Sequence, residues 1–334
     1  MLKRHSNSPI LRPSDIPGAH PLLVDASSVF NPGAIHFAGK HRMVLRTQSR
    51  SRESFMLPAE SEDGVKFSVN GKPIVFANMP ETPVVSHAYD PRLTIIDGRC
   101  YIMFAADLAD CCTLGLAVTD DFEKFEFLGF TTGTYADTRN GVLFPEKING
   151  RYLRLERPNI PQDEGNPTSG DIITLSESDD LLDWTHSANV ISGRWRYWDE
   201  RIGAGPPPIK TKHGWLVIYH GVATHFASSN IYQAGAVLLD PDDPSKVLAR
   251  TRLNILEPRE LYELTGQVPN VVFPSGCIPS EIGADGTVPD HATLNIYYGA
   301  ADTCIGLATA TVHEIIDACR TPSGDPGQPL TEVC

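Results

Sequence analysis

Three stretches of the chain follow one template: SEDGVKF at residues 61–67, TDDFEKF at 119–125 and SDDLLDW at 178–184. Each begins with Ser or Thr, has Asp two positions later and ends on an aromatic residue. The anchoring residues Asp63, Asp121 and Asp180 are 58 and 59 residues apart, and Asp240 lies 60 residues further on. A repeat of this length indicates one structural unit that recurs along the chain.

Each repeat has room for about four short strands. Apolar runs that favour strands precede the aspartates, as at 114–118 and 172–175, and further runs follow Gly-containing turns such as Asp97-Gly98 and Asn149-Gly150. Four-stranded units that recur in this way are typical of propeller blades, and 334 residues hold five of them. We therefore predict an all-β fold, a five-bladed β-propeller.

The ends of the chain differ from the repeats. One helix is predicted at 311–319, where Val312, Ile315, Ile316 and Cys319 have an amphipathic spacing. We expect an N-terminal extension (1–30) packed on the propeller, the propeller itself over 31–320, and a mobile tail rich in Pro and Gly (321–334).

The composition limits the classes of function. A net charge of -13 argues against nucleic acid or an anionic membrane as a partner. No apolar run approaches the roughly 18 residues of a membrane span, and the N-terminus lacks the apolar core of a signal peptide. Seven cysteines without a CxxC pair are expected to be reduced thiols, so we expect a cytoplasmic protein. The eleven histidines have no metal-ligand spacing, and we expect no metal and no cofactor.

Polar residues recur near the start of each expected blade, and a propeller brings such positions together around its axis. The candidates are Asn31, Arg52, Asp90, Arg139, Asn140, Arg201, His220 and Asp302. Asp90 stands directly ahead of an apolar strand, where a carboxylate could donate a proton or bind sugar hydroxyls. Simpler interpretations exist: Asp90 could start an Asp-Pro turn, and Arg52 could belong to a solvated charged face.

Five motifs in order give the chain a family resemblance. They are YDPR (89–92), NGVLFPEKI (140–148), IGAGPPPI (202–209), GWLVIYHGV (214–222) and YYGAADT (297–303). Together they resemble glycoside hydrolase family 130, whose members are β-mannoside phosphorylases and some β-mannosidases on a five-bladed propeller. The resemblance runs from about Asn31 to about Cys319.

The resemblance implies a reaction and a set of residues. It gives Asp90 the role of general acid, protonating the departing oxygen through the mannose 3-hydroxyl while phosphate attacks from the opposite face and yields α-mannose 1-phosphate. It implies phosphate-binding roles for Arg52, Arg139, Asn140, Arg201, His220 and Tyr232. It implies substrate contacts by Asn31, Ser51, Tyr89, Arg92, Lys147 and Asp302. The partners are then a β-mannoside oligosaccharide and inorganic phosphate as co-substrate, and a homo-oligomer is possible.

Three features of this chain depart from the family pattern: Tyr89 stands where relatives often have Glu, Arg201 where many have Lys, and Leu155-Glu156-Arg157-Pro158 replaces a common Leu-His-Arg-Pro. The linkage (β-1,2 or β-1,4) and the acceptor sugar stay open, with acceptor contacts expected on the loops 159–170 and 224–230. Arg92, two residues from Asp90, should share its strand face and lower its pKa. We expect bound phosphate to raise that pKa again.

Two other functions remain open at this point. A β-mannosidase would need a second carboxylate to activate water, for which Glu146, Glu156 and Glu200 are the candidates. A propeller that only binds glycans would show no turnover. Phosphate is itself an anionic nucleophile, so a phosphorylase needs cations in place of that second carboxylate.

Overall fold

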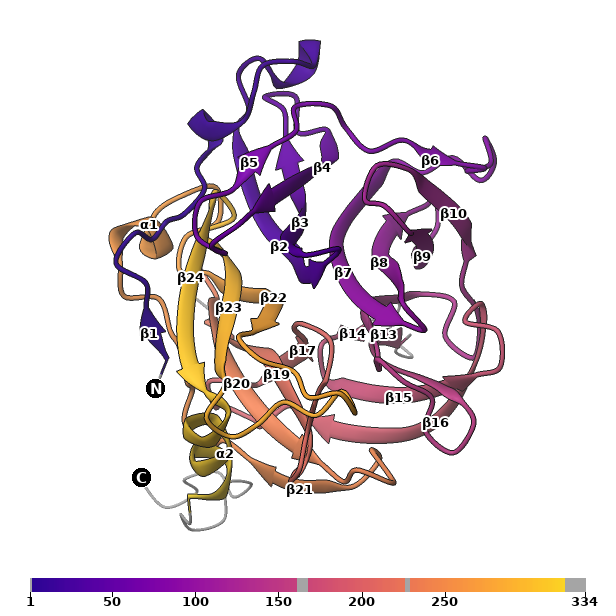
Figure 1. Ribbon diagram of the computed structural model, residues 1–334, viewed down its shortest axis with the longest axis vertical. Helices are drawn as coiled ribbons and strands as arrows, with labels where there is room; N and C mark the ends of the chain where they lie inside the picture. The colour runs from indigo at the N-terminus through magenta and orange to yellow at the C-terminus, as the bar shows by residue number, and fades with distance from the viewer. Residues whose placement is uncertain (1, 161–167, 226–228, 322–334) are drawn as a thin grey trace.

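The protein, seen in a computed structural model that describes residues 2–160, 168–225 and 229–321, is a ring of five sheets around a central axis (Figure 1). The prediction of a five-bladed β-propeller is confirmed. The first strand of each blade lies nearest the axis, and the following strands step outward. Most of the tail expected at 321–334 lies outside the described residues.

The blades are antiparallel meanders with short additions. Blade 1 contains β2 (Ser28–Phe37), β3 (Lys40–Gln48), β4 (Ser54–Ser61) and β5 (Ser68–Val69). Blade 2 contains β7 (His87–Ile96), β8 (Arg99–Asp107), β9 (Cys112–Thr119), β10 (Phe125–Phe130) and the parallel edge strand β6 (Phe76–Ala77). Blade 3 contains β12 (Thr138–Leu143), β13 (Tyr152–Ile160), β15 (Ile172–Ser178), β16 (Asp183–Ser192), β11 (Thr132–Gly133) and β14 (Thr168–Ser169).

The last two blades close the ring. Blade 4 contains β17 (Arg201–Ala204), β18 (Ile209–Thr211), β19 (Gly214–Ala223), β20 (Ile231–Leu239) and β21 (Val247–Arg250). Blade 5 contains β22 (Val272–Pro279), β23 (Thr293–Ala300), β24 (Cys304–Thr311) and β1 (Lys3–Arg4). Because β1 pairs antiparallel with β24, the N-terminal strand forms the outer edge of the blade made by the C-terminal strands.

The repeated aspartates have one structural role. In Asp63, Asp121, Asp180 and Asp240 the Oδ1 atom accepts hydrogen bonds from the backbone N–H groups two and three residues further on. Each therefore caps the tight turn between the third and fourth strands of a blade. The fifth repeat ends differently, because Thr311 caps the helix α2 (Val312–Arg320) instead.

The core consists of five apolar layers, one between each pair of neighbouring blades. Successive side chains of a strand point to opposite faces, so each blade contributes to the layers on both of its sides. Trp184, for example, fills the layer between blades 2 and 3, and Trp215 the layer between blades 3 and 4. These layers fix the angular positions of the blades and hence the positions of the residues at the axis.

Helices contribute little to the fold. The helix predicted at 311–319 is present as α2, and its apolar side chains are buried against the layer between blades 4 and 5. The sequence did not indicate the one-turn helix α1 (Leu261–Leu264) or the 3-10 turns η1 (Pro13–Asp15) and η2 (Pro21–Leu23). No helix in the described part of the chain has the length and apolar character needed to cross a bilayer.

Candidate active site

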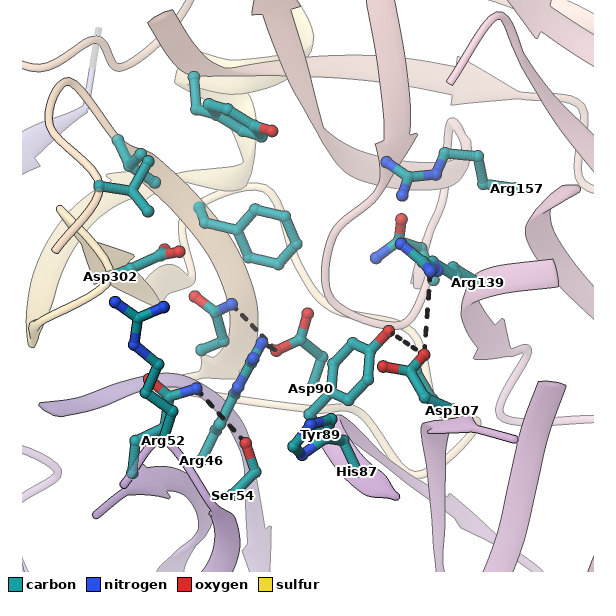
Figure 2. A pocket seen from close by; sticks show the side chains of 18 residues that line it. Arg46, Arg52, Ser54, His87, Tyr89, Asp90, Asp107, Arg139, Arg157 and Asp302 are labelled. Atoms are coloured by element: carbon teal, nitrogen blue, oxygen red, sulfur yellow. Dashed lines mark hydrogen bonds and ion pairs between the residues drawn. The ribbon is translucent and has the colours of Figure 1, made fainter. Parts of the chain in front are cut away.

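A cavity of about 510 Å³ opens where the inner strands meet, and all five blades line it. Its walls include Asn31, Arg46, Gln48, Arg52 and Ser54 of blade 1, His87, Tyr89, Asp90 and Asp107 of blade 2, Arg139, Asn140 and Arg157 of blade 3, Tyr232 of blade 4, and Val268, Val271, Phe273 and Asp302 of blade 5. Figure 2 shows Asp90 between Arg139 and Arg157 on one side and Arg52 and Asp302 on the other. The volume is within the range of pockets that enclose small-molecule ligands.

Three β-bulges direct polar side chains into this cavity. The inner strands β2, β7 and β12 each have a register shift near their N-terminal ends, at Asn31, Asp90 and Asn140. These residues have left-handed backbones, with φ of 45°, 53° and 52°. Asn and Asp tolerate this conformation better than other residues with side chains. Bulges commonly re-aim a side chain beside an active site, and here three blades use the same device.

Asp90 is held by an amide and a guanidinium. Its Oδ1 accepts hydrogen bonds from Asn31 Nδ2 at 3.0 Å and from Arg46 Nη1 at 2.9 Å. Burial by itself raises the pKa of the Asp90 carboxyl, but the charges of Arg46 and Arg92 and the Asn31 hydrogen bond outweigh it and lower the pKa overall. In the free protein Asp90 is therefore a carboxylate at neutral pH.

Arg92 is not among the residues that line the cavity, and the substrate contact expected of it stays a prediction. The bulge at Asp90 breaks the alternation of an extended strand, and the Arg92 side chain turns inward, 1% exposed. It donates to the Gly205 carbonyl at 2.6 Å and to the Asp90 carbonyl at 3.0 Å. Arg92 therefore ties blade 2 to blade 4 beneath the cavity and acts on Asp90 through its charge.

The cavity carries an excess of positive charge in a protein that is acidic as a whole. Of its four arginines, Arg46 pairs with Asp90, and Arg139 lies 3.8 Å from Asp107. Arg52 and Arg157 make no ion pair with any of the residues that the structure describes. Arg157 is partly buried, and its Nε atom is buried without a hydrogen-bond partner. The pKa of its guanidinium is lowered, mainly by burial. A buried cation without a counter-ion favours binding of an anion.

His220 is buried next to Arg157 and is not among the residues that line the cavity, so the direct phosphate contact expected of it stays a prediction. Its ring is fully buried, 4.5 Å from the Phe273 ring and 6.2 Å from the Tyr232 ring between centroids. Burial, with the charges of Arg157 and Arg92, holds the pKa of His220 well below its usual value. The neutral ring faces Arg157 Nη1 through Nε2 at 3.4 Å, and Gly203 leaves room for it, since a Cβ there would lie 2.4 Å from the His220 ring.

Three more expected site residues lie outside the cavity lining. Ser51 is exposed, and its hydroxyl bonds to Glu53 at 2.8 Å. Lys147 is exposed, with its ammonium 4.2 Å from the centre of the Tyr152 ring, so the substrate contact expected of it is not supported. Arg201, the first residue of β17, lies near enough for its charge to act on Tyr232, whose pKa is raised chiefly by burial.

The glutamates considered as a hydrolytic base are all outside the cavity lining. Glu146 pairs with Lys210 at 2.9 Å, and Glu156 is fully buried against Arg154 at 2.8 Å. Glu200 accepts a hydrogen bond from the Thr224 hydroxyl. The carboxylates that line the cavity are Asp90, Asp107 and Asp302, and Asp107 accepts from the Tyr89 hydroxyl at 2.8 Å.

Several cavity residues were missed from the sequence: Arg46, Gln48, Ser54, His87, Asp107, Arg157 and Phe273. Arg46 had a detectable signal, because it lies two residues from the buried Val44 on the second strand of blade 1 and so points to the same face, toward blade 2. Arg157 belonged to a noted motif, Leu155 to Pro158, to which no role was given. Of the loops expected to contact the acceptor, residues 161–167 and 226–228 lie outside the described chain.

The carboxyl of Asp302, which lines the cavity, has a raised pKa. Burial raises its pKa from 3.8 to about 6, with the Arg46 charge opposing and the Asp90 charge adding to this. The folded protein then keeps a proton that the unfolded chain releases, so stability falls as pH rises from about 4 to about 6.

We expect Asp302→Asn to remove this loss. Relative to wild type, the free energy of unfolding of the variant should rise between pH 4 and pH 6 by on the order of 2 kcal/mol and then level off. Urea unfolding at several pH values measures it, with Asp110→Asn as an exposed control. A difference between variant and wild type that is independent of pH would contradict the raised pKa.

The described residues contain no group of three or more His, Cys, Asp or Glu side chains arranged to hold a metal ion. The polar atoms of the cavity are mainly guanidinium and amide donors, with an apolar wall of Val268, Val271 and Phe273. Such donors bind oxyanions and sugar hydroxyls. The protein is thus a propeller whose axial cavity combines carboxylates with a cationic pocket, a set of groups that suits a sugar and an oxyanion.

Comparison with known proteins agrees with this class. The sequence profile described as β-1,4-mannooligosaccharide phosphorylase matches residues 1–321. A β-1,4-mannooligosaccharide phosphorylase of Ruminococcus albus is 33% identical, with 96% of this chain and 91% of the relative covered. A 1,2-β-oligomannan phosphorylase of Thermoanaerobacter is 34% identical, over 94% of this chain and 98% of the relative.

A solved structure shows the same fold. The β-1,2-mannobiose phosphorylase of Listeria innocua, in complex with β-1,2-mannobiose, superposes with a TM-score of 0.82 at 28% identity, covering 96% of this chain and 99% of the other. The chain belongs to glycoside hydrolase family 130.

Proposed function

We propose that the protein is an inverting β-mannoside phosphorylase, which uses inorganic phosphate to cleave a β-mannosidic bond and releases α-mannose 1-phosphate. The relatives in the comparison bear the names of mannoside phosphorylases. Because the proposed product carries a single mannose unit, the mannose that is transferred is the one at the non-reducing end of the substrate. The rest of the substrate is the leaving group.

The cavity supplies a group for each part of this reaction. A phosphate oxygen forms a bond to C1 of mannose as the bond from C1 to the glycosidic oxygen breaks. The electron pair stays on the departing oxygen, which takes a proton that originates from Asp90. Asn31 and Arg46 fix the orientation of the Asp90 carboxyl. The apolar wall at Phe273 suits the face of a sugar ring, and Asp302 and Asn31 suit its hydroxyls.

The observation that carries the proposal is the position of Arg157 and Arg139 on one side of Asp90, where Arg157 has no carboxylate partner among the described residues (Figure 2). A phosphate ion there would supply negative charge and accept hydrogen bonds from the guanidinium fork of Arg157. The Asn140 amide lines the same cavity. An inverting hydrolase would need a carboxylate to activate water, and the three glutamates considered for that role lie outside the cavity lining.

Three finer points complete the proposal. Phosphate is oriented by protein groups, so no metal or organic cofactor is required. The charged product does not cross a bilayer, so a cytoplasmic location suits the reaction.

A homo-oligomer would cover large apolar side chains such as Leu253 (67% exposed) and Leu261 (74% exposed). Light scattering measures the mass of the protein in solution and hence its oligomeric state.

The test is incubation with β-1,4-mannobiose and with β-1,2-mannobiose, with and without phosphate, in the presence of EDTA. Phosphorus NMR should show α-mannose 1-phosphate for at least one linkage, and only when phosphate is present. Mannose released equally without phosphate would favour the β-mannosidase instead. No turnover of either disaccharide would favour a glycan-binding propeller. Loss of activity in EDTA would overturn the absence of a metal.

A further inference from the structure

A second depression, of about 550 Å³, lies on blade 4 at the same end of the strands as the cavity. Its lining includes Trp195, Tyr197, Glu200, Thr224 and His225. The first three precede β17, and the last two follow β19. Val222, two residues before Thr224, pairs with Tyr232, which lines the central cavity. The depression therefore lies next to the cavity on the surface of the protein.

Trp195 is the unusual residue of this depression. It is 69% exposed, whereas Trp184, Trp198 and Trp215 are at most 9% exposed. Its neighbour Arg196 has a left-handed backbone, with φ of 55°, and a guanidinium 5.9 Å from the centre of the Trp195 indole. Exposure of a large aromatic surface and a left-handed non-glycine residue both cost free energy, and such costs are often found at ligand sites.

The segment that carries Trp195 is rigidly anchored. Asp199 is fully buried, and its carboxylate accepts bonds from Arg194 at 2.7 Å, from Arg250 at 2.6 Å and from the Tyr219 hydroxyl at 2.7 Å. Trp198 Nε1 donates to the Arg252 carbonyl at 2.8 Å. These bonds fix the segment 193–200 to β19 and to the end of β21. The exposed indole is thus presented by a preorganised platform, which lowers the entropy cost of binding a ligand.

We propose that Trp195 is the stacking platform of an outer subsite that binds the third or a later mannose unit of a β-manno-oligosaccharide. The proposal rests on the function proposed above. The cavity has a volume of only about 510 Å³, so a substrate of three or more units would extend beyond it onto the surface. The apolar C–H face of a pyranose suits the indole face, and the Glu200 carboxylate, the Thr224 hydroxyl and the His225 ring can bind its hydroxyls.

The first experiment compares Trp195→Ala with wild type on mannobiose and mannotetraose of the linkage that is cleaved. We expect kcat/KM for mannotetraose to fall about 5- to 10-fold, as loss of one ring contact predicts, and kcat/KM for mannobiose to stay within about twofold. Trp195→Phe keeps an aromatic face and should recover most of the loss. Val84→Ala, which truncates another exposed apolar side chain, serves as the control.

The second experiment does not depend on turnover. Trp195 is the exposed one of four tryptophans, so mannotetraose should change the tryptophan emission of wild type and leave that of Trp195→Phe unchanged. Equal losses on both substrates, or no loss on either, would overturn the subsite. An emission change with no phosphorolysis of any substrate would overturn the proposed function and keep the sugar site. No emission change would overturn the site whatever the activity.

Discussion

Asp90→Asn is expected to lower kcat/KM for phosphorolysis of mannobiose by a factor of about 10² to 10⁴, the range that a positioned general acid contributes. Asparagine keeps the size of the side chain and can still bond to Asn31, but it cannot give a proton to the departing oxygen. The assay is release of mannose 1-phosphate. Asp120→Asn, which removes a carboxylate in a surface ion pair with Arg99, should stay within about twofold of wild type.

A substrate with a better leaving group separates the loss of acid catalysis from the loss of structure. An aryl β-mannoside whose phenolate leaves without protonation should be cleaved by Asp90→Asn at a rate much closer to that of wild type. Arg46 loses its ion pair in this variant, so the thermal midpoint is measured as well. If the aryl substrate shows the same loss as mannobiose, Asp90 acts in binding or structure and not as the acid.

The pKa of Asp90 adds a pH signature to this prediction. It is low in the free protein, although burial raises it, because Arg46 and Arg92 stabilise the carboxylate. A general acid must hold its proton until the bond breaks. Bound phosphate brings negative charge into the cavity and should raise the pKa, so activity should persist to higher pH at saturating phosphate than at limiting phosphate. An alkaline limb that does not move with phosphate concentration would count against this coupling.

The second large effect is expected from Arg157→Met. Hydrogen bonds to charged groups contribute roughly 1.5 to 3 kcal/mol, so the KM for phosphate should rise about 10- to 100-fold. In phosphate-free buffer the variant should be at least as stable as wild type, because an unpaired buried guanidinium is replaced by an apolar chain of similar length. Initial rates over a series of phosphate concentrations and thermal unfolding measure the two effects.

Wild type should gain thermal stability from phosphate as binding shifts the unfolding equilibrium, and Arg157→Met should lose most of this gain. Arg99→Met, at an exposed surface ion pair, is the matched control and should behave as wild type. A variant with an unchanged KM for phosphate but a higher KM for the mannoside would assign Arg157 to the sugar. Lower stability without phosphate would show that Arg157 is needed by the fold through its contact with His220.

The fold was predictable because its determinants are local and repeated. The turn aspartates, such as Asp121, bond to backbone groups two and three residues away, so the residues that make the turn are adjacent in sequence. Paired turn residues such as Asp97 and Gly98 both have positive φ, as a tight hairpin requires, and this preference is also visible in sequence. The number of blades then follows from chain length and repeat length.

The sequence was less reliable for single site residues. Eight of the residues that it predicted for the site line one cavity in the structure: Asn31, Arg52, Tyr89, Asp90, Arg139, Asn140, Tyr232 and Asp302. The sequence did not show the bulge at Asp90, beside which Arg92 is buried outside the cavity lining. It did not show the depth of His220 either, because the position of a side chain behind Tyr232 and Phe273 depends on the packing of two blades.

The amino-acid sequence by itself determined the repeat, the strands and the turns, because each depends on residue types within a few positions of one another. It pointed to Asp90 as the candidate acid only through the family resemblance of its motif. Only the tertiary structure decided which cations meet at the axis and which of them lack a partner. Arg46 is paired by a carboxylate 44 residues away, and Arg157 makes no ion pair within the described chain. Closure of the ring sets the distances between the arginines and the carboxylates at the axis, and the charge balance of the cavity depends on those distances.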